Sequence, residues 1–212
     1  NMLISASVLS DKIKPKDAIE LFDKTNVDYI HVDIMDGKFT ENKSYTISEV
    51  IKYSNYTSKP LDIHLMVKNP DKYIDDLSTL YVNNITFHYE AVKNHLDIIN
   101  HIKNNGIKVG IAINPDTSPK EIFGLLKYTD VVLIMSVVPG KSGQKFMESV
   151  LYKIDVLKKE IEEKNYKTLI SVDGGVNEEN ISILKEKNVD ILVSSSYLLS
   201  GEINNKISLM RN

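Results

Sequence analysis

The chain of 212 residues contains no cysteine. A disulfide framework and a metal site built on thiolates are therefore both excluded. No stretch approaches the roughly 20 consecutive apolar residues that a membrane-spanning helix needs. The opening segment NMLISASVLS has neither a basic flank nor a long apolar core, so it does not resemble a secretory signal. We expect a cytoplasmic protein with no membrane partner.

An excess of basic charge is also missing, and arginine is almost absent. The chain has 26 basic and 29 acidic side chains and a formal net charge of -3, which leaves no basic surface of the kind that binds nucleic acid. The only arginine is Arg211, next to the last residue. An anion site elsewhere in the chain must therefore use lysine or backbone N–H groups.

Short apolar runs alternate with stretches of helical spacing along the whole chain. This order, without a linker rich in Pro, Gly or Ser, predicts an α/β fold, a single (β/α)8 TIM barrel spanning residues 1–212. An open doubly wound sheet is the alternative, and the absence of G-x-G-x-x-G after the first strand weighs against its dinucleotide-binding form. The expected strands are Leu3–Ser7, Tyr29–Met35, Pro60–Met66, Asn84–His88, Lys108–Ile113, Val131–Met135, Thr168–Val172 and Asp190–Val193, and helical stretches include Pro15–Thr25, Pro70–Tyr81, His95–Asn104, Pro119–Lys127, Met147–Lys164 and Glu178–Lys187.

Acidic and imidazole side chains gather near the ends of four expected strands. Residues two apart on a strand project from the same face, and active sites of the barrel fold lie at the C-terminal ends of its strands. We therefore expect these side chains to share one rim. They are His31 and Asp33, Asp62 and His64, His88 and Glu90, and Asp173.

Four of these side chains suit one divalent transition metal ion. We choose His31, Asp33, His64 and Asp173 as ligands, since neutral imidazole suits Zn, Fe or Co and carboxylate oxygen also admits Mn. A cation would compensate carboxylates whose unpaired burial costs several kcal/mol. Taken singly, each residue could instead be a hydrogen-bonded core histidine or a helix-capping aspartate.

Two further aspartates near this rim have less direct roles. Asp62 is expected to orient His64, although a role in the turn at the strand end fits equally well. Asp36, which precedes Gly37, is expected to cap or brace the turn there rather than to join the metal site.

The last two strand ends indicate an anion site. Gly174 and Gly175 follow the seventh strand, and Ser195 and Ser196 follow the eighth. These loops form the usual phosphate site of the barrel fold, where backbone N–H groups and a helix N-terminus hold the anion. The alternative is that the glycines only turn the chain.

The segment VVPGKSGQKF, residues 137–146, follows the sixth strand. Its length and position suit a lid that closes over a substrate, with Lys141 and Lys145 adding positive charge, although it could be an ordinary turn. Three strand-end methionines, Met35, Met66 and Met135, are either core filler or an apolar lining of the site.

Taken together, several segments resemble a known family. HVDIMDGKF, LDIHLMV, FHYE, MSVVPGKSGQKF and VDGGV, in this order and at barrel spacing, are similar to ribulose-phosphate 3-epimerase and related ketose-phosphate 3-epimerases, from about Ser5 to about Leu199. The resemblance implies a barrel enzyme that uses a divalent metal to interconvert D-ribulose 5-phosphate and D-xylulose 5-phosphate. It further implies a small-molecule sugar phosphate as partner and a homo-oligomeric state.

The resemblance also implies residue roles. His31, Asp33, His64 and Asp173 match the family's metal ligands, and Asp33 and Asp173 match its catalytic proton-transfer pair. Epimerisation beside a carbonyl removes a proton from one face of carbon 3 and returns one to the other face, which requires two acid–base groups. The substrate-binding set expected here is Ser7, Met35, His64, Met66, Met135, Gly143, Gly174, Gly175, Ser195 and Ser196.

Three departures from the family pattern affect the expected substrate. Thr40-Glu41-Asn42 replaces the usual Val-Pro-Asn, the lid differs from Asn-Pro-Gly-Phe-Gly-Gly-Gln, and Ser195 replaces a glycine. They leave every ligand and proton carrier in place but alter the lid and the phosphate end. A hexulose phosphate such as D-allulose 6-phosphate is therefore the main alternative substrate, and a sugar-phosphate-binding barrel without catalysis is the alternative class. A barrel decarboxylase would need a strand-end lysine, which DIMD, LDIHLM and SVDGG lack.

Overall fold

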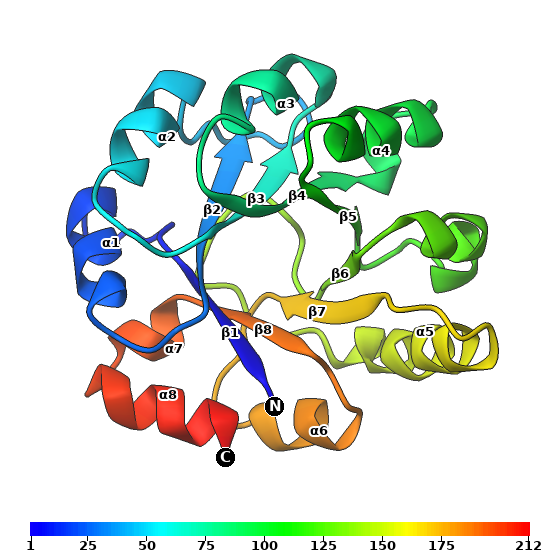
Figure 1. The fold of residues 1–212 in the computed structure, drawn as a ribbon. Helices are drawn as coiled ribbons and strands as arrows, with labels where there is room; N and C mark the ends of the chain where they lie inside the picture. Colours follow the sequence, from blue (N-terminus) through cyan, green and yellow to red (C-terminus); the bar gives the residue numbers. More distant parts are fainter.

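Eight parallel strands follow one another around a closed barrel in the computed structural model, which describes residues 1–212 (Figure 1). Each strand pairs with the next along the chain, and β8 returns to pair with β1. The predicted TIM barrel is confirmed. The strands are β1 (Leu3–Ser7), β2 (Tyr29–Met35), β3 (Leu61–Met66), β4 (Val82–His88), β5 (Lys108–Ile113), β6 (Val131–Met135), β7 (Leu169–Asp173) and β8 (Ile191–Ser194).

Helices surround the barrel (Figure 1). The α-helices are α1 (Pro15–Asp23), α2 (Ile47–Ser54), α3 (Asp71–Leu77), α4 (His95–Asn104), α5 (Leu151–Glu163), α6 (Ile181–Glu186), α7 (Ser196–Leu199) and α8 (Ile203–Arg211), and the 3₁₀ helices are η1 (Tyr89–Ala91), η2 (Pro119–Tyr128) and η3 (Glu148–Val150). No helix combines the length and the apolar character that crossing a bilayer requires.

The connection between β5 and β6 differs in kind from the other helical connections. The periodicity over 119–127 predicts a helix, and the structure has a 3₁₀ helix there instead of an α-helix. Ile122 and Leu126 are still buried, while Gly124 in the middle of the segment lowers its α-helical propensity. The apolar spacing therefore identified the buried face but not the type of helix.

The two faces of each strand have different surroundings. On β2, Ile30, Val32 and Ile34 belong to the large apolar cluster that the helices cover, while the alternate residues His31 and Asp33 point inward and are buried with polar partners. The two-residue period of a strand thus separates the packing residues from the chemical ones.

The barrel interior is itself divided. Five buried apolar residues gather on the side of β5, β6 and β8: Ala112, Leu133, Met135, Val137 and Val193. The inward positions of β1, β3 and β4 carry hydrogen-bonded polar residues, namely Ser5, Asp62, Asn84 and Thr86. The polar side lies beneath the imidazoles and carboxylates at the rim.

Candidate active site

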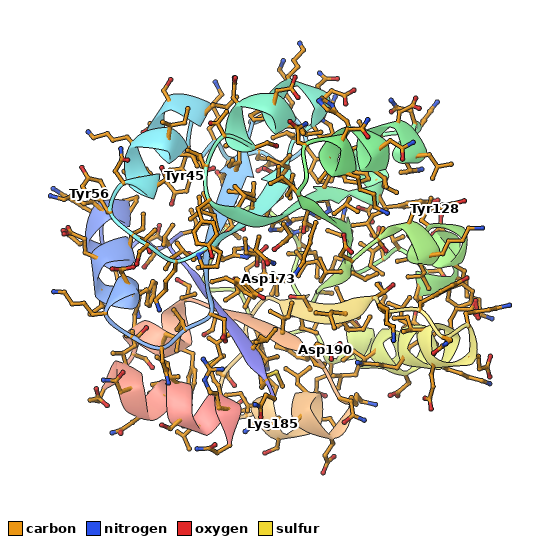
Figure 2. All side chains as sticks on the ribbon, viewed as in Figure 1. Tyr45, Tyr56, Tyr128, Asp173, Lys185 and Asp190 are labelled. Atoms are coloured by element: carbon orange, nitrogen blue, oxygen red, sulfur yellow. The ribbon has the colours of Figure 1, made fainter.

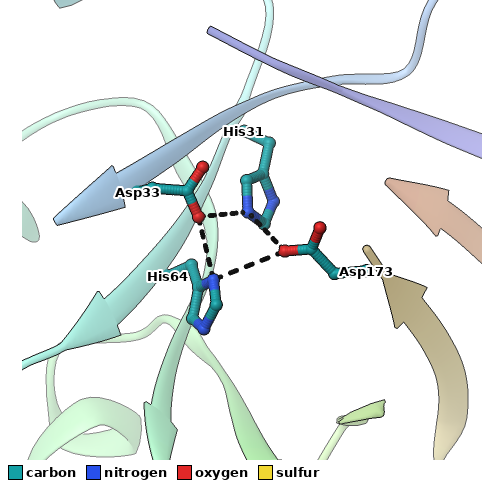
Figure 3. Close-up of side chains that lie close together, drawn as sticks. All are labelled: His31, Asp33, His64 and Asp173. Carbon is teal, nitrogen blue, oxygen red and sulfur yellow. Dashed lines mark hydrogen bonds and ion pairs between the residues drawn. The ribbon is translucent and has the colours of Figure 1, made fainter. Parts of the chain in front are cut away.

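Two imidazoles and two carboxylates converge inside the barrel mouth (Figure 3). His31 and Asp33 come from β2, His64 from β3 and Asp173 from β7. Oδ1 of Asp33 lies 3.0 Å from Nε2 of His31 and 2.9 Å from Nδ1 of His64. Oδ2 of Asp173 lies 3.4 Å and 3.6 Å from the same two nitrogens. Figure 2 shows Asp173 near the centre of the ring of helices.

This cluster could hold a metal ion. One ligand atom from each of the four residues lies within 4.8 Å of the other three, and two imidazole nitrogens with two carboxylate oxygens form a donor set that suits Zn, Fe, Mn or Co. No ammonium group contributes to the cluster. The sequence-based expectation that these four residues meet is confirmed by their geometry.

Charge within the cluster is balanced by proton sharing. Burial lowers the pKa of His31, but the carboxylates of Asp33 and Asp62 outweigh burial and raise it well above its usual value. Burial likewise lowers the pKa of His64, which hydrogen bonding to Asp173 and Asp33 raises overall. Burial raises the pKa of Asp33, but His31 and His64 hold it well below its usual range. The imidazoles and carboxylates therefore favour each other's charged forms, and a cation would take over this role by displacing protons.

Asp62 orients a different histidine from the expected one. Its Oδ2 accepts a hydrogen bond from Nδ1 of His31 at 2.8 Å and another from Oγ of Ser5 at 2.8 Å. The expectation that Asp62 orients His64 is wrong, because the strand register pairs Asp62 with His31 and pairs His64 with Asp33. The contact leaves Nε2 of His31 facing the cluster.

Asp36 has the structural role that the sequence predicts. Its Oδ1 accepts from the backbone N–H groups of Lys38 and Phe39, and its Oδ2 accepts from the N–H of Lys68. These contacts fix the turn at Gly37, where φ is +73°. Asp36 is not part of the metal cluster.

A cavity of about 420 Å³ opens beside the cluster. All ten residues of the expected substrate-binding set line it: Ser7, Met35, His64, Met66, Met135, Gly143, Gly174, Gly175, Ser195 and Ser196. The Ser7 hydroxyl donates to Oδ2 of Asp33 at 2.9 Å. Asp33 and Asp173 also line the cavity, so both carboxylates can reach a ligand there.

The segment after β6 covers one side of this cavity. Nε2 of Gln144 donates to the carbonyl groups of Val138 and Lys141, at 2.6 Å and 3.0 Å. Asn42, from the β2–α2 connection, donates to the carbonyl of Gly140 at 3.0 Å. Two segments in which the chain departs from the family pattern therefore touch each other.

Three lysines line the cavity, and two of them stand at positions that the sequence motifs did not indicate. Lys12 and Lys206 line it, together with the expected Lys141, whereas Lys145 does not. Nζ of Lys206 lies 4.5 Å from the centre of the Tyr197 ring. No local signal marks Lys12 or Lys206, because only barrel closure brings α8 and the β1–α1 connection to this rim.

Comparison with known proteins identifies the family. A family model described as the ribulose-phosphate 3 epimerase family matches residues 3–199. The chain is 40% identical over 200 residues to the ribulose-phosphate 3-epimerase of Methanocaldococcus jannaschii, covering 94% of this chain and 85% of that protein. It is 38% identical over 187 residues to the enzyme of the same name from Helicobacter pylori strain J99, covering 87% and 85%.

Solved structures agree on the fold alone. A tryptophan synthase chain from Mycobacterium tuberculosis superposes with a TM-score of 0.73 at 10% identity, covering 99% of this chain and 91% of that one. Phosphoribosylanthranilate isomerase from Pyrococcus furiosus gives a TM-score of 0.66 at 13% identity, with coverages of 99% and 95%. Sequence identity, not this shared fold, carries the assignment: the chain belongs to the ribulose-phosphate 3 epimerase family and is an isomerase of the epimerase class.

Proposed function

We propose that the protein interconverts D-ribulose 5-phosphate and D-xylulose 5-phosphate by epimerisation at carbon 3. The observation that carries this proposal is the pair Asp33 and Asp173, two carboxylates that approach the cluster from different strands and both line the cavity (Figure 3). Two such groups are what removal of a proton from one face of a carbon and return to the other face requires.

The four clustered residues His31, Asp33, His64 and Asp173 would hold one divalent transition metal ion. When bound, the metal supplies Lewis-acid polarisation of the substrate ketone and compensates the negative charge that develops on the enediolate. Among Zn, Fe, Mn and Co, the mixed nitrogen and oxygen donors favour none outright.

The two aspartates divide the proton transfer. One carboxylate takes the proton from carbon 3 while the other carboxyl group donates a proton to the opposite face, and their roles exchange in the reverse direction. Ser7 donates to Oδ2 of Asp33, so this hydroxyl orients the carboxylate and favours its charged form. Met35, Met66 and Met135, each at most 4% exposed, give the reacting carbons an apolar, water-poor lining.

Backbone groups would hold the phosphate. Gly143, Gly174, Gly175 and Ser196 line the same cavity, and N–H groups at such positions bind anions without arginine. Ser195 is compatible with this role because its φ is -130°, a conformation that needs no glycine. Its hydroxyl donates to the carbonyl of Leu9 at 3.0 Å.

A hexulose phosphate, such as D-allulose 6-phosphate, is the second candidate substrate. This alternative rests on the altered lid, where Val138, Lys141 and Ser142 replace the family's Asn, Phe and Gly, and Lys141 and Ser142 line the cavity. A longer substrate would need more room there.

A substrate panel tests the proposal. Metal-stripped protein is reloaded with Zn²⁺, Fe²⁺, Mn²⁺ or Co²⁺, and kcat/KM is measured for both candidate substrates. We expect at least one metal to support conversion of the pentulose phosphate with a kcat/KM more than about 10-fold above that for the hexulose phosphate, equivalent to about 1.4 kcal/mol. A higher kcat/KM for the hexulose phosphate would make it the substrate in place of the pentulose phosphate. Binding of both sugar phosphates without conversion would indicate the non-catalytic barrel. A homo-oligomeric state and a cytoplasmic location stay predictions, and light scattering would test the first.

A further inference from the structure

His64 is the end of a chain of polar contacts that leads away from the cavity. Its Nε2 lies 2.8 Å from Nε2 of His88, and Nδ1 of His88 lies 3.2 Å from Oε1 of Glu90. The two imidazoles are fully buried and stacked, with ring centres 5.0 Å apart and planes inclined by 25°. Neither His88 nor Glu90 lines the cavity, so neither can touch a substrate there.

The far end of this chain is fixed. Oε2 of Glu90 accepts hydrogen bonds from the backbone N–H of Asn114 at 2.7 Å and from Oγ1 of Thr117 at 2.6 Å. The loop that supplies them is held by Lys153, whose buried Nζ donates to the carbonyl groups of Asn114, Pro115 and Thr117. Glu90 therefore presents Oε1 to His88 from a defined position.

The fixed acceptor determines where the ring protons lie. An ionised carboxylate only accepts hydrogen bonds, so Nδ1 of His88 carries the proton and its Nε2 keeps a lone pair. That lone pair accepts the proton on Nε2 of His64. In the metal-free protein Nδ1 of His64 donates to Oδ1 of Asp33, 2.9 Å away. Because Nε2 already carries a proton, a metal that displaces the proton on Nδ1 finds there the lone pair it needs.

We propose that His88 and Glu90 are positioning residues that hold His64 in the tautomer able to bind metal through Nδ1. The inference rests on the proposed metal site. The nitrogen of His31 that faces away from the cluster contacts the carboxylate of Asp62 directly. The corresponding nitrogen of His64 contacts His88, which in turn contacts the carboxylate of Glu90. Partners of this kind orient a metal-binding histidine and raise its basicity.

Replacing Glu90 by glutamine should reverse the donor and acceptor roles along the hydrogen bonds from residue 90 through His88 to His64. The N–H of Asn114 can only donate, so it requires the amide oxygen of the new side chain and leaves the amide NH₂ facing His88. Nδ1 of His88 must then accept, its Nε2 becomes the donor, and His64 is forced to carry its proton on Nδ1. Glu90→Ala imposes no such reversal, because water can replace the carboxylate of this half-buried side chain.

The experiment compares Zn²⁺ affinity by competition with a chromophoric chelator for wild type, Glu90→Gln and Glu90→Ala. The matched control is Glu49→Gln, since Glu49 also accepts from a backbone N–H and a threonine hydroxyl, both of Thr46, but lies at the start of α2. We expect Glu90→Gln to weaken binding about 10–100-fold, Glu90→Ala to weaken it less, and the control to stay within about twofold of wild type. A role in folding alone predicts the opposite order of the two Glu90 variants.

Ring ¹⁵N chemical shifts of the Zn²⁺-loaded wild type provide a second readout. We expect protonated Nε2 on His64 and protonated Nδ1 on His88, and the opposite assignment would overturn the inference. If Glu90→Gln fails to fold, two variants of His88 replace it. His88→Gln, whose amide oxygen can accept from His64, should bind Zn²⁺ more tightly than His88→Leu. Equal affinities of these two variants would contradict the positioning role of His88. Wild-type protein that binds no Zn²⁺ would overturn the proposed metal site itself, whereas tight wild-type binding with an unchanged Glu90→Gln would overturn only this inference.

Discussion

Nδ1 of His31 donates a hydrogen bond of 2.8 Å to Oδ2 of Asp62, its direct partner on the adjacent strand β3. The contact fixes the His31 ring and leaves Nε2 free to face the cluster. Asp62 receives two further hydrogen bonds, from Ser5 on Oδ2 and from Asn84 on Oδ1. All three donors therefore depend on a carboxylate at this position.

Asp62→Asn should weaken metal binding about 10–100-fold, the usual effect of losing a partner that orients a metal-bound histidine. An amide must turn its NH₂ toward one of the three donors that the carboxylate accepts. Calorimetric titration of metal-stripped protein measures the change. Asp130→Asn is the control, since Asp130 accepts from the N–H of Val109 at the opposite end of the barrel. Equal affinities for wild type and Asp62→Asn would contradict this role.

Asp33→Asn and Asp173→Asn should each lower kcat by about 100- to 10,000-fold while the protein stays folded, because each removes one of the two acid–base groups. Both residues also belong to the metal cluster, so turnover is measured at saturating metal with the bound metal quantified. Circular dichroism controls for the fold. Either variant with turnover close to wild type at full metal occupancy would refute the two-base assignment.

Gly175→Ala should raise the KM for the sugar phosphate about 10-fold, a loss of about 1.4 kcal/mol. Gly175 has a φ of +66°, and an added Cβ would lie 2.4 Å from the backbone nitrogen of Phe146 and 2.8 Å from the carbonyl oxygen of Gln144. The segment that covers the cavity would have to move.

Gly106→Ala separates this effect from backbone strain. Gly106 has a φ of +75° with nothing within 4 Å of an added Cβ, so Gly106→Ala should lose about 1–2 kcal/mol of stability in urea unfolding from backbone strain alone. Gly175→Ala has the same strain and the close contacts as well, so it should lose more. Only Gly175→Ala should change KM. An equal KM for the two variants would show that the close approach of Gly175 to Phe146 does not affect substrate binding.

Metal affinity should fall as the pH is lowered. The neighbouring carboxylates raise the pKa of His31 and of His64 in the metal-free protein, so below these pKa values a metal must displace protons. Each displaced proton reduces affinity about 10-fold per pH unit. Zn²⁺ dissociation constants at several values between pH 5.5 and pH 8 test this, and a constant affinity over that interval would contradict proton competition.

The four clustered residues could be predicted from the sequence because local rules suffice for them. His31 and Asp33 share a face through the two-residue strand period, and the barrel brings His64 and Asp173 to the same rim. Apolar runs likewise predicted all eight strands within one or two residues at their ends. The expected glycines and serines of the cavity lining followed from the usual phosphate site of the barrel fold, and Ser7 and Gly143 followed from the family resemblance.

The partners of the histidines could not be predicted, because they depend on register between strands. Nothing within LDIHLM shows that Asp62 lies opposite His31, and nothing within FHYE shows that His88 reaches Nε2 of His64. Lys206 reaches the cavity only because the helix after β8 packs back over the rim. Contacts between distant segments require the closed barrel.

Conversion of D-ribulose 5-phosphate in heavy water tests the central claim most directly. Two separate bases, Asp33 and Asp173, act on opposite faces of carbon 3, so the hydrogen that one removes is not the hydrogen that the other returns. Nuclear magnetic resonance of the product formed by metal-loaded protein should show deuterium at carbon 3 in essentially every molecule of D-xylulose 5-phosphate. Product that retains the substrate's own hydrogen at carbon 3 would contradict the two-base account.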